Sequence, residues 1–198
     1  MAKIISGTGG QIDLAMYDVM LSQMNYLAGA WLNAGEPASR FASSAHPYVV
    51  PAQIFATKDS WISLFISHDG FWRVFCEEVG RPDWIADERL ATMAARRQNR
   101  EFVVAEVGAL LHRETTADWV RRLAPLGVVV SGVETLEQAL AGDIASSRGM
   151  VVTIPTDAGP IKAVGNPIKI EGEATEYRAP PLLGEHNDVD PRDSSRGH

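Results

Sequence analysis

Two histidines stand within one short, aromatic-rich stretch, HPYVVPAQIFATKDSWISLFISHDGFW, which covers residues 46–72. A histidine changes its charge near neutral pH, so His46 or His68 could act as a general acid or base. Both residues stand at expected turns, where an imidazole more often hydrogen-bonds to the backbone. We therefore favour a structural role for each, with acid–base chemistry as the alternative.

Two further features could carry chemistry. Cys76 is followed by Glu77 and Glu78, and acidic neighbours raise the pKa of a thiol and disfavour the reactive thiolate. We expect Cys76 to be a packed helix residue rather than a nucleophile. The segment ARRQNR, residues 95–100, carries three arginines. These arginines could hold a phosphate or a carboxylate, or they could form a solvated charged face.

Known site motifs are absent from the sequence. The other three histidines, His112, His186 and His198, are scattered, with no HxH or HExxH spacing, so we expect no metal site. There is no GxSxG, no P-loop, and no GxGxxG that opens a helix. The GTGG of residues 7–10 has no strand before it. The residues alone therefore predict no self-contained catalytic site and no permanently bound cofactor.

Composition narrows the choice of partners and compartment. The net charge of −7 over 198 residues argues against binding to nucleic acid or to an anionic membrane surface. No apolar run reaches the ~18–20 residues of a membrane span, and the N-terminus does not resemble a signal peptide. The single cysteine excludes an internal disulfide and fits a cytoplasmic protein.

The elements that would position these residues can be predicted from periodicity. An apolar stripe indicates one long helix from Ile12 to about Asn33, ended by Gly35 and Pro37. Residues 52–57 and 61–66 are short and rich in β-formers, and the polar tip between them indicates a hairpin. We expect Asp69 to be the N-cap of a helix over 71–79.

Helices follow the hairpin, and strands return near the end of the chain. We expect a helical turn near residue 84, helices over 97–112 and from Thr115 or Thr116, a short buried strand over 128–130, and a further helix before residue 143. Strands are expected in MVVTIP and IKAVGNPIKI, joined by a polar turn. The fold class is therefore α+β. The expected parts are a flexible lead-in (1–10), a long linking helix (11–40), a small domain (41–147), C-terminal strands and tail (148–190), and a disordered end (191–198).

Five stretches, in this order, resemble the family III CoA-transferases, the group of the formyl-CoA, carnitine and bile-acid CoA-transferases. They are GQIDLAMYDVMLSQM (10–24), HPYVVPAQIFATKDSWISLFISHDGFWRVFCEEVGRPDW (46–84), DERLATMAARRQNREFV (87–103), TTADWVRRLAPLGVVVSGVETLEQAL (115–140) and APPLLGEHNDV (179–189). No single motif is decisive, and the specificity lies in the ordered series. Together they run from about Gly10 to Val189.

The resemblance implies a function and also an incomplete enzyme. Members of this family move CoA between an acyl-CoA thioester and a carboxylic acid, and they are usually about twice this long. Their N-terminal half holds the CoA-binding fold and the catalytic aspartate, and nothing in this sequence corresponds to it. We therefore expect a C-terminal portion of the fold, inactive alone, that works with a companion N-terminal half or as a homo-oligomer.

The resemblance also suggests which residues shape the acyl pocket. The small domain of the family turns its hairpin toward the cleft, so the pocket candidates are His46, Tyr48, Gln53 and His68. Related racemases place a glutamate where His68 falls, which favours a transferase over a racemase. Some relatives carry a glycine-rich loop where this chain has PYVVPAQ, so the gating role of that loop is not implied here.

Two alternatives to a transferase portion remain open. One is a non-catalytic interaction or structural protein that retains this part of the fold. The other is a portion of an acyl-CoA racemase-like enzyme. The identity of the acyl group cannot be read from these residues.

Overall fold

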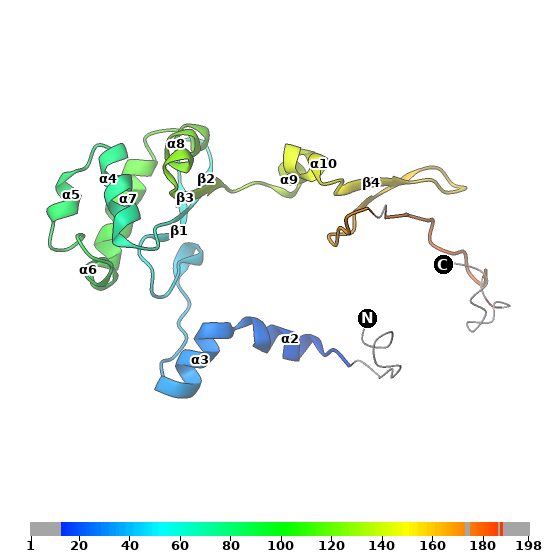
Figure 1. Ribbon diagram of the computed structural model, residues 1–198, viewed down its shortest axis with the longest axis horizontal. Coiled ribbons are helices and arrows are strands. Elements are labelled where there is room, and N and C mark those ends of the chain that lie inside the picture. Colours follow the sequence, from blue (N-terminus) through cyan, green and yellow to red (C-terminus); the bar gives the residue numbers. More distant parts are fainter. Residues whose placement is uncertain (1–12, 173–174, 186, 188–198) are drawn as a thin grey trace. The chain divides into compact units, whose positions relative to one another are not determined.

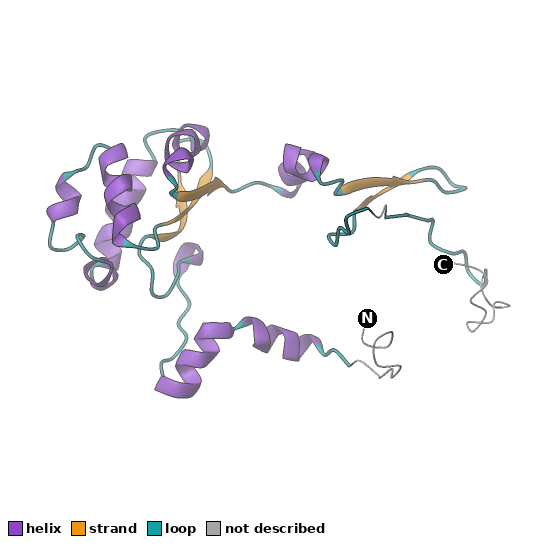
Figure 2. Cartoon of the chain, in the orientation of Figure 1, coloured by secondary structure: helices purple, strands orange, loops and turns teal. Residues whose placement is uncertain are grey.

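The structure is a computed structural model that describes residues 13–172, 175–185 and 187. The described residues fall into two compact units that divide between Val133 and Glu134, and Figure 1 labels their elements. Helices and small antiparallel sheets make up both units, as Figure 2 shows, so the expected α+β class is confirmed. The expected lead-in (1–10) and disordered end (191–198) lie outside the described residues.

The long N-terminal helix expected from the sequence is two helices. Helix α2 spans Met16–Gln23 and helix α3 spans Asn25–Ala34. Asn25 has a positive φ of 40°, a conformation that asparagine tolerates better than most residues but that a continuous helix cannot contain. Helix α3 ends at Gly35, which has φ 66° in the left-handed region, as the sequence predicted. Neither helix buries a single residue.

The predicted hairpin is present and forms most of a three-stranded sheet. Strand β1 (Ala52–Ala56) pairs antiparallel with β2 (Trp61–Phe65), which pairs antiparallel with β3 (Val129–Gly132). Phe55 lies opposite Ile62 in this register. The expectation of a buried strand over 128–130 is only partly right. Val128 is buried, whereas Val129 is 56% exposed, because alternate side chains of an edge strand point to opposite faces.

Five helices follow or flank the sheet in the first unit. They are α4 (Asp69–Glu78), α5 (Asp83–Ala86), α6 (Met93–Gln98), α7 (Arg100–Leu111) and α8 (Thr116–Leu123), with 3₁₀ turns η1 (Ala42–Ser44) and η2 (Ala124–Leu126). The helix expected over 97–112 is broken at Asn99, whose backbone leaves the helical region. Thr115 caps α8 by accepting from the backbone N–H of Asp118.

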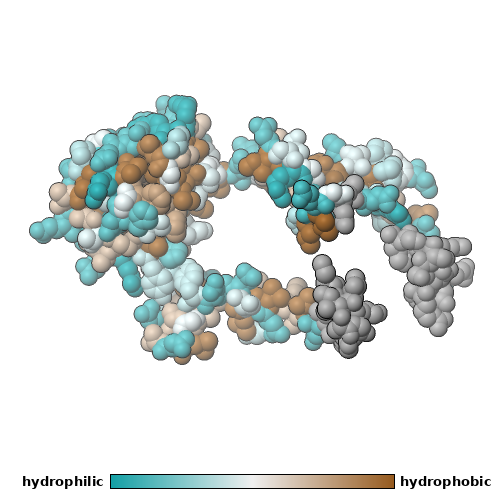
Figure 3. All heavy atoms as spheres, viewed as in Figure 1, coloured by the Kyte–Doolittle hydropathy of each residue, from teal (hydrophilic) through white to brown (hydrophobic). Residues whose placement is uncertain are grey.

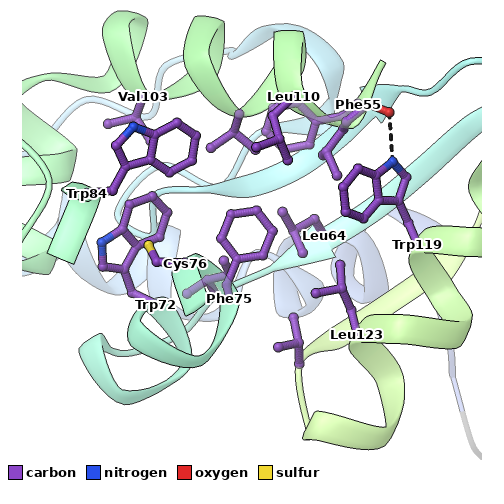
Figure 4. Packing of buried hydrophobic residues seen from close by; sticks show 14 of the residues in the cluster. Phe55, Leu64, Trp72, Phe75, Cys76, Trp84, Val103, Leu110, Trp119 and Leu123 are labelled. Atoms are coloured by element: carbon purple, nitrogen blue, oxygen red, sulfur yellow. Dashed lines mark hydrogen bonds between the residues drawn. The ribbon is translucent and has the colours of Figure 1, made fainter. Parts of the chain in front are cut away.

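A single hydrophobic cluster joins the sheet to these helices. Figure 4 shows it from close by, with aromatic rings from α4, α5 and α8 packed beside strand residues. Trp72 stacks on Trp84 with ring centroids 5.8 Å apart. The buried indole of Trp119 donates to the carbonyl of Leu111 at 2.8 Å. Only one face of the sheet enters this core, so the other face is left open to form part of a site.

The second unit is smaller and has little core. Thr135 and Gln138 form a capping box that begins α9 (Leu136–Ala141), and α10 (Asp143–Ser147) follows after Gly142. Helix α9 confirms the helix expected before residue 143, whereas α10 was not expected. Strands β4 (Val151–Ile154) and β5 (Ile161–Val164) pair antiparallel, which confirms the strands predicted after residue 148. Residues 165–170, expected to continue the second strand, are not part of it.

Candidate functional site

His46 closes a tight turn just before β1. Its backbone N–H donates to the carbonyl of Ala52 at 2.8 Å. Its Nδ1 atom accepts from the backbone N–H groups of Tyr48 and Val49 at 3.1 and 3.0 Å. Arg100 donates to the His46 carbonyl from the other side. The imidazole therefore has the structural role that we favoured from the sequence.

The hydrogen bonds of His46 fix its tautomer. Because Nδ1 accepts from two N–H groups, it carries no proton, and the hydrogen of the neutral ring lies on Nε2. Nε2 lies 3.0 Å from the hydroxyl oxygen of Tyr26 and donates to it. The two rings are also stacked, with centroids 5.6 Å apart. Burial lowers the pKa of His46, and the nearby Arg100 charge lowers it further.

This lowered pKa predicts a pH effect on stability. The folded state disfavours the imidazolium, so the unfolded chain binds more protons in the acid range, and stability falls as pH falls through the histidine range. We expect the thermal unfolding midpoint to drop between about pH 7.5 and about pH 5, and to drop less in His46→Asn. Asparagine can still accept from backbone N–H groups in a turn but does not titrate. Equal drops in the two proteins would contradict the conclusion that His46 causes this loss of stability.

Tyr48 lies beside His46 but faces a different partner. Their ring centroids are 6.2 Å apart. The Tyr48 hydroxyl donates to Glu36 at 3.0 Å, and this hydrogen bond raises the pKa of the phenol. The guanidinium of Arg97 lies 4.9 Å from the Tyr48 ring centroid. These side chains line a pocket of about 280 Å³ that also includes Leu27 from α3.

Gln53 is a half-buried residue of β1, opposite Leu64 on the neighbouring strand. It lines a second pocket, of about 380 Å³, together with His46 and Tyr26. Tyr26 was not among the residues that we expected from the sequence. It lies within the long helix expected from the sequence, and nothing in the local sequence showed that its hydroxyl would meet an imidazole twenty residues away.

His68 is the N-cap of α4, so the expected cap at Asp69 is wrong by one residue. The Nδ1 atom of His68 accepts from the backbone N–H groups of Gly70 and Phe71 at 3.1 and 3.3 Å. Its ring stacks on Phe71 at 4.1 Å. The Asp69 side chain does not cap the helix, and its carboxylate accepts from Arg96 at 2.8 Å. No hydrogen bond or ring contact in the described parts of the chain joins His68 to the other three candidates.

Of the three arginines in residues 95–100, only Arg97 fits the solvated charged face that was one of the two sequence interpretations. Arg96 is fully buried and structural, and Arg100 donates to the carbonyls of His46 and Pro47. Arg97 is the exposed member of the three. Cys76 is fully buried, and burial raises the pKa of its thiol to about 12. The expected packed position of Cys76 in a helix is therefore confirmed, and burial rather than acidic neighbours is the main cause of the raised pKa.

Within the described ranges, no cluster of three or more histidine, cysteine or carboxylate side chains could hold a metal ion. None of the helices in those ranges is both long and apolar enough to span a bilayer. The structure thus brings together His46, Tyr48 and Gln53 around two small pockets. These pockets offer hydrogen bonds and shape, and in their described lining His46 donates to Tyr26 rather than acting as its base.

Comparison with known proteins places this arrangement in a family. The chain is 30% identical to an acyl-CoA transferase of Fusarium pseudograminearum, over 94% of this chain and 41% of the relative. It is 24% identical to the acetyl-CoA:oxalate CoA-transferase of Acetobacter aceti, over 90% of this chain and 45% of the relative. The chain thus spans about half the length of the curated relatives that it matches.

Solved structures show the same fold. The crystal structure of Rv3272 from Mycobacterium tuberculosis superposes with a TM-score of 0.79 at 23% identity, over 95% of this chain and 49% of that one. A CAIB/BAIF family protein from Brucella suis gives a TM-score of 0.73 at 26% identity, over 94% and 48%. The sequence profile described as CoA-transferase family III matches residues 1–187. The resemblance in the sequence is thereby confirmed, and the chain belongs to CoA-transferase family III.

Proposed function

We propose that this chain is the C-terminal portion of a CoA-transferase that moves CoA between an acyl-CoA thioester and a carboxylic acid. The observation that carries the proposal is the family match over residues 1–187, in a chain that spans about half of its relatives. In this proposal the chain supplies one wall of the acyl pocket through His46, Tyr48 and Gln53. The remaining half of the fold supplies the nucleophile, and the CoA thioester is a substrate rather than a resident cofactor.

The experiment that tests this proposal combines the chain with the N-terminal half of a family enzyme by co-expression. The copurified pair is assayed for transfer of CoA from a panel of acyl-CoA donors to free carboxylic acids, with the product thioester identified by mass. Transfer that requires both halves is the expected result. A pair that forms but moves no CoA to any acid would contradict the proposal and favour a non-catalytic interaction protein. We place this activity in the cytoplasm, in keeping with one unpaired, buried cysteine.

The need for a partner is also supported by the surface of α2 and α3. We define the helix surface as the exposed apolar side chains Met16, Met20, Met24, Trp31 and Leu32, which are 46–87% exposed. Figure 3 shows hydrophobic atoms over this part of the chain. Patches of this kind are uncommon on stable monomers. We infer that a companion half or a second copy of the chain covers them.

The helix surface predicts that the isolated chain associates. Burial of ~500 Å² of apolar area is worth roughly 12 kcal/mol before the entropic cost of association. Light scattering at micromolar concentration should give a mass above the 21.5 kDa of one chain. The double variant Met16→Glu/Met20→Glu should return it to one chain, whereas Ile144→Glu, equally exposed in the second unit, should not. A wild-type mass of 21.5 kDa would show that association is not needed.

A further inference from the structure

The pocket of about 380 Å³ lies beside the hairpin and is lined from both faces of it, because Gln53 and the core residue Leu64, which face each other across the strands, also belong to its lining. Ile54 and Ser63 face each other across the two strands and both line it, whereas Phe55 and Ile62 point to the opposite side and are buried. His46 and Tyr26 complete its wall. None of the described side chains that line it is a lysine, an arginine or a carboxylate. The described side chains that line the pocket are therefore uncharged whenever His46 is neutral, and a nearby cation, Arg100, donates to the carbonyls of His46 and Pro47.

A directed chain of hydrogen bonds ends in this pocket. The backbone N–H groups of Tyr48 and Val49 donate to Nδ1 of His46, which forces the ring hydrogen onto Nε2. Nε2–H then donates to the hydroxyl oxygen of Tyr26. That oxygen now accepts a hydrogen bond, and its own hydrogen is left to donate elsewhere. Within the described ranges, no other partner of the Tyr26 hydroxyl is found, and about half of the side chain is exposed.

We propose that Tyr26 is a specificity-determining residue, whose hydroxyl donates to an oxygen of an uncharged acyl group in this pocket. His46 is the positioning residue that sets the direction of the donor. The inference rests on the proposed CoA-transferase function and adds the class of acyl group to it. A donor whose direction is fixed discriminates between substrates that do and do not offer an acceptor, since a donor that is left unmatched once the substrate covers it costs free energy.

The described lining contains no lysine or arginine, and this predicts a second preference, against acyl groups that carry a second carboxylate. A carboxylate at the far end of an acyl group would be removed from water without a positive partner among the described lining side chains, because the nearby Arg100 already donates to the carbonyls of His46 and Pro47, and this is costly. His46 does not supply that charge, because its environment disfavours the imidazolium. An acyl tail with a carbonyl or hydroxyl oxygen matches the lining, whereas a tail with a second carboxylate does not.

The test compares two donors of equal chain length in the chain combined with the rest of the fold. Acetoacetyl-CoA carries a keto oxygen on its acyl tail, and butyryl-CoA lacks it. We expect Tyr26→Phe to lower the ratio of kcat/KM for acetoacetyl-CoA to that for butyryl-CoA by about tenfold, the usual worth of one directed hydrogen bond. Succinyl-CoA should be a poor donor in both proteins. Tyr17→Phe removes an exposed hydroxyl from α2 and should leave the ratio unchanged.

The outcomes separate this inference from the function on which it rests. If the wild-type pair transfers CoA but the ratio is the same in Tyr26→Phe, the specificity role of Tyr26 is wrong and the transferase function stands. If the wild-type pair prefers succinyl-CoA to the other two donors, the inference that the pocket takes an uncharged acyl group is wrong, and the transferase function again stands. If the wild-type pair transfers CoA from none of the three donors, the proposed function fails and the inference fails with it. His46→Asn should also lower the ratio if it positions the hydroxyl.

Discussion

The purified 198-residue chain on its own is expected to transfer no measurable CoA from an acyl-CoA to a free carboxylic acid. Transfer in two steps needs a nucleophile that accepts the acyl group, together with a group that activates it. In the described residues, Nδ1 of His46 and Nδ1 of His68 are both occupied by backbone N–H groups. The thiol of Cys76 is buried, with a pKa of about 12. The loss relative to a complete enzyme should exceed about a millionfold.

The measurement is thioester exchange followed by mass spectrometry, with the chain alone and with the chain combined with the N-terminal half of a family enzyme. The combination is the positive control, because it shows that the assay detects transfer and that the chain is folded. Exchange catalysed by the chain alone would contradict the prediction and would require a nucleophile in this half. An inactive chain in an active pair would support the division of roles between the two halves.

The hairpin and the helix ends that were predicted correctly depend on local chemistry. The two strands alternate around a polar tip, and Gly35 ends α3 through a backbone conformation that glycine adopts without strain. The N-cap of α4 was predicted wrongly because two adjacent residues, His68 and Asp69, can both accept hydrogen bonds from the first backbone N–H groups of a helix. His68 rather than Asp69 caps α4, because the carboxylate of Asp69 accepts a hydrogen bond from Arg96, which is distant in sequence. A sequence pattern cannot show that contact.

The candidate site was predictable in part. Resemblance to the family gave His46, Tyr48, Gln53 and His68 as pocket candidates, and the first three lie around the two pockets, whereas His68 caps α4. Tyr26 was missed because its role depends on the packing of α3 against the turn before β1. The three arginines of residues 95–100 were equally ambiguous in sequence. One is buried, one binds backbone carbonyls, and one is exposed, and only the tertiary fold separates them.

Arg96 is the buried arginine, and it joins three parts of the first unit. Nε donates to the carbonyl of Val50 at 2.9 Å, Nη1 to that of Leu90 at 2.7 Å, and Nη2 to Asp69 at 2.8 Å. The guanidinium also lies over the ring of Trp72, 4.8 Å from its centroid. Burial lowers the pKa of this guanidinium, while Asp69 opposes the shift. Its charge is therefore tolerated in the core only because each of its three nitrogen atoms has a partner.

Truncation of Arg96 should strongly destabilise the first unit. Arg96→Ala removes the donors to two buried carbonyls and opens a cavity beside Trp72, so we expect a loss of roughly 3–5 kcal/mol in the free energy of unfolding. Arg121→Ala is the matched control, since Arg121 is 71% exposed and, among the described residues, forms an ion pair only with Asp118 three residues away. That pair should contribute about 0.5 kcal/mol or less. Urea unfolding followed by tryptophan fluorescence measures both variants. Similar midpoints for the two variants would mean that the hydrogen bonds of Arg96 are replaced by water, and that the turn before β1 and helix α4 hold together without it.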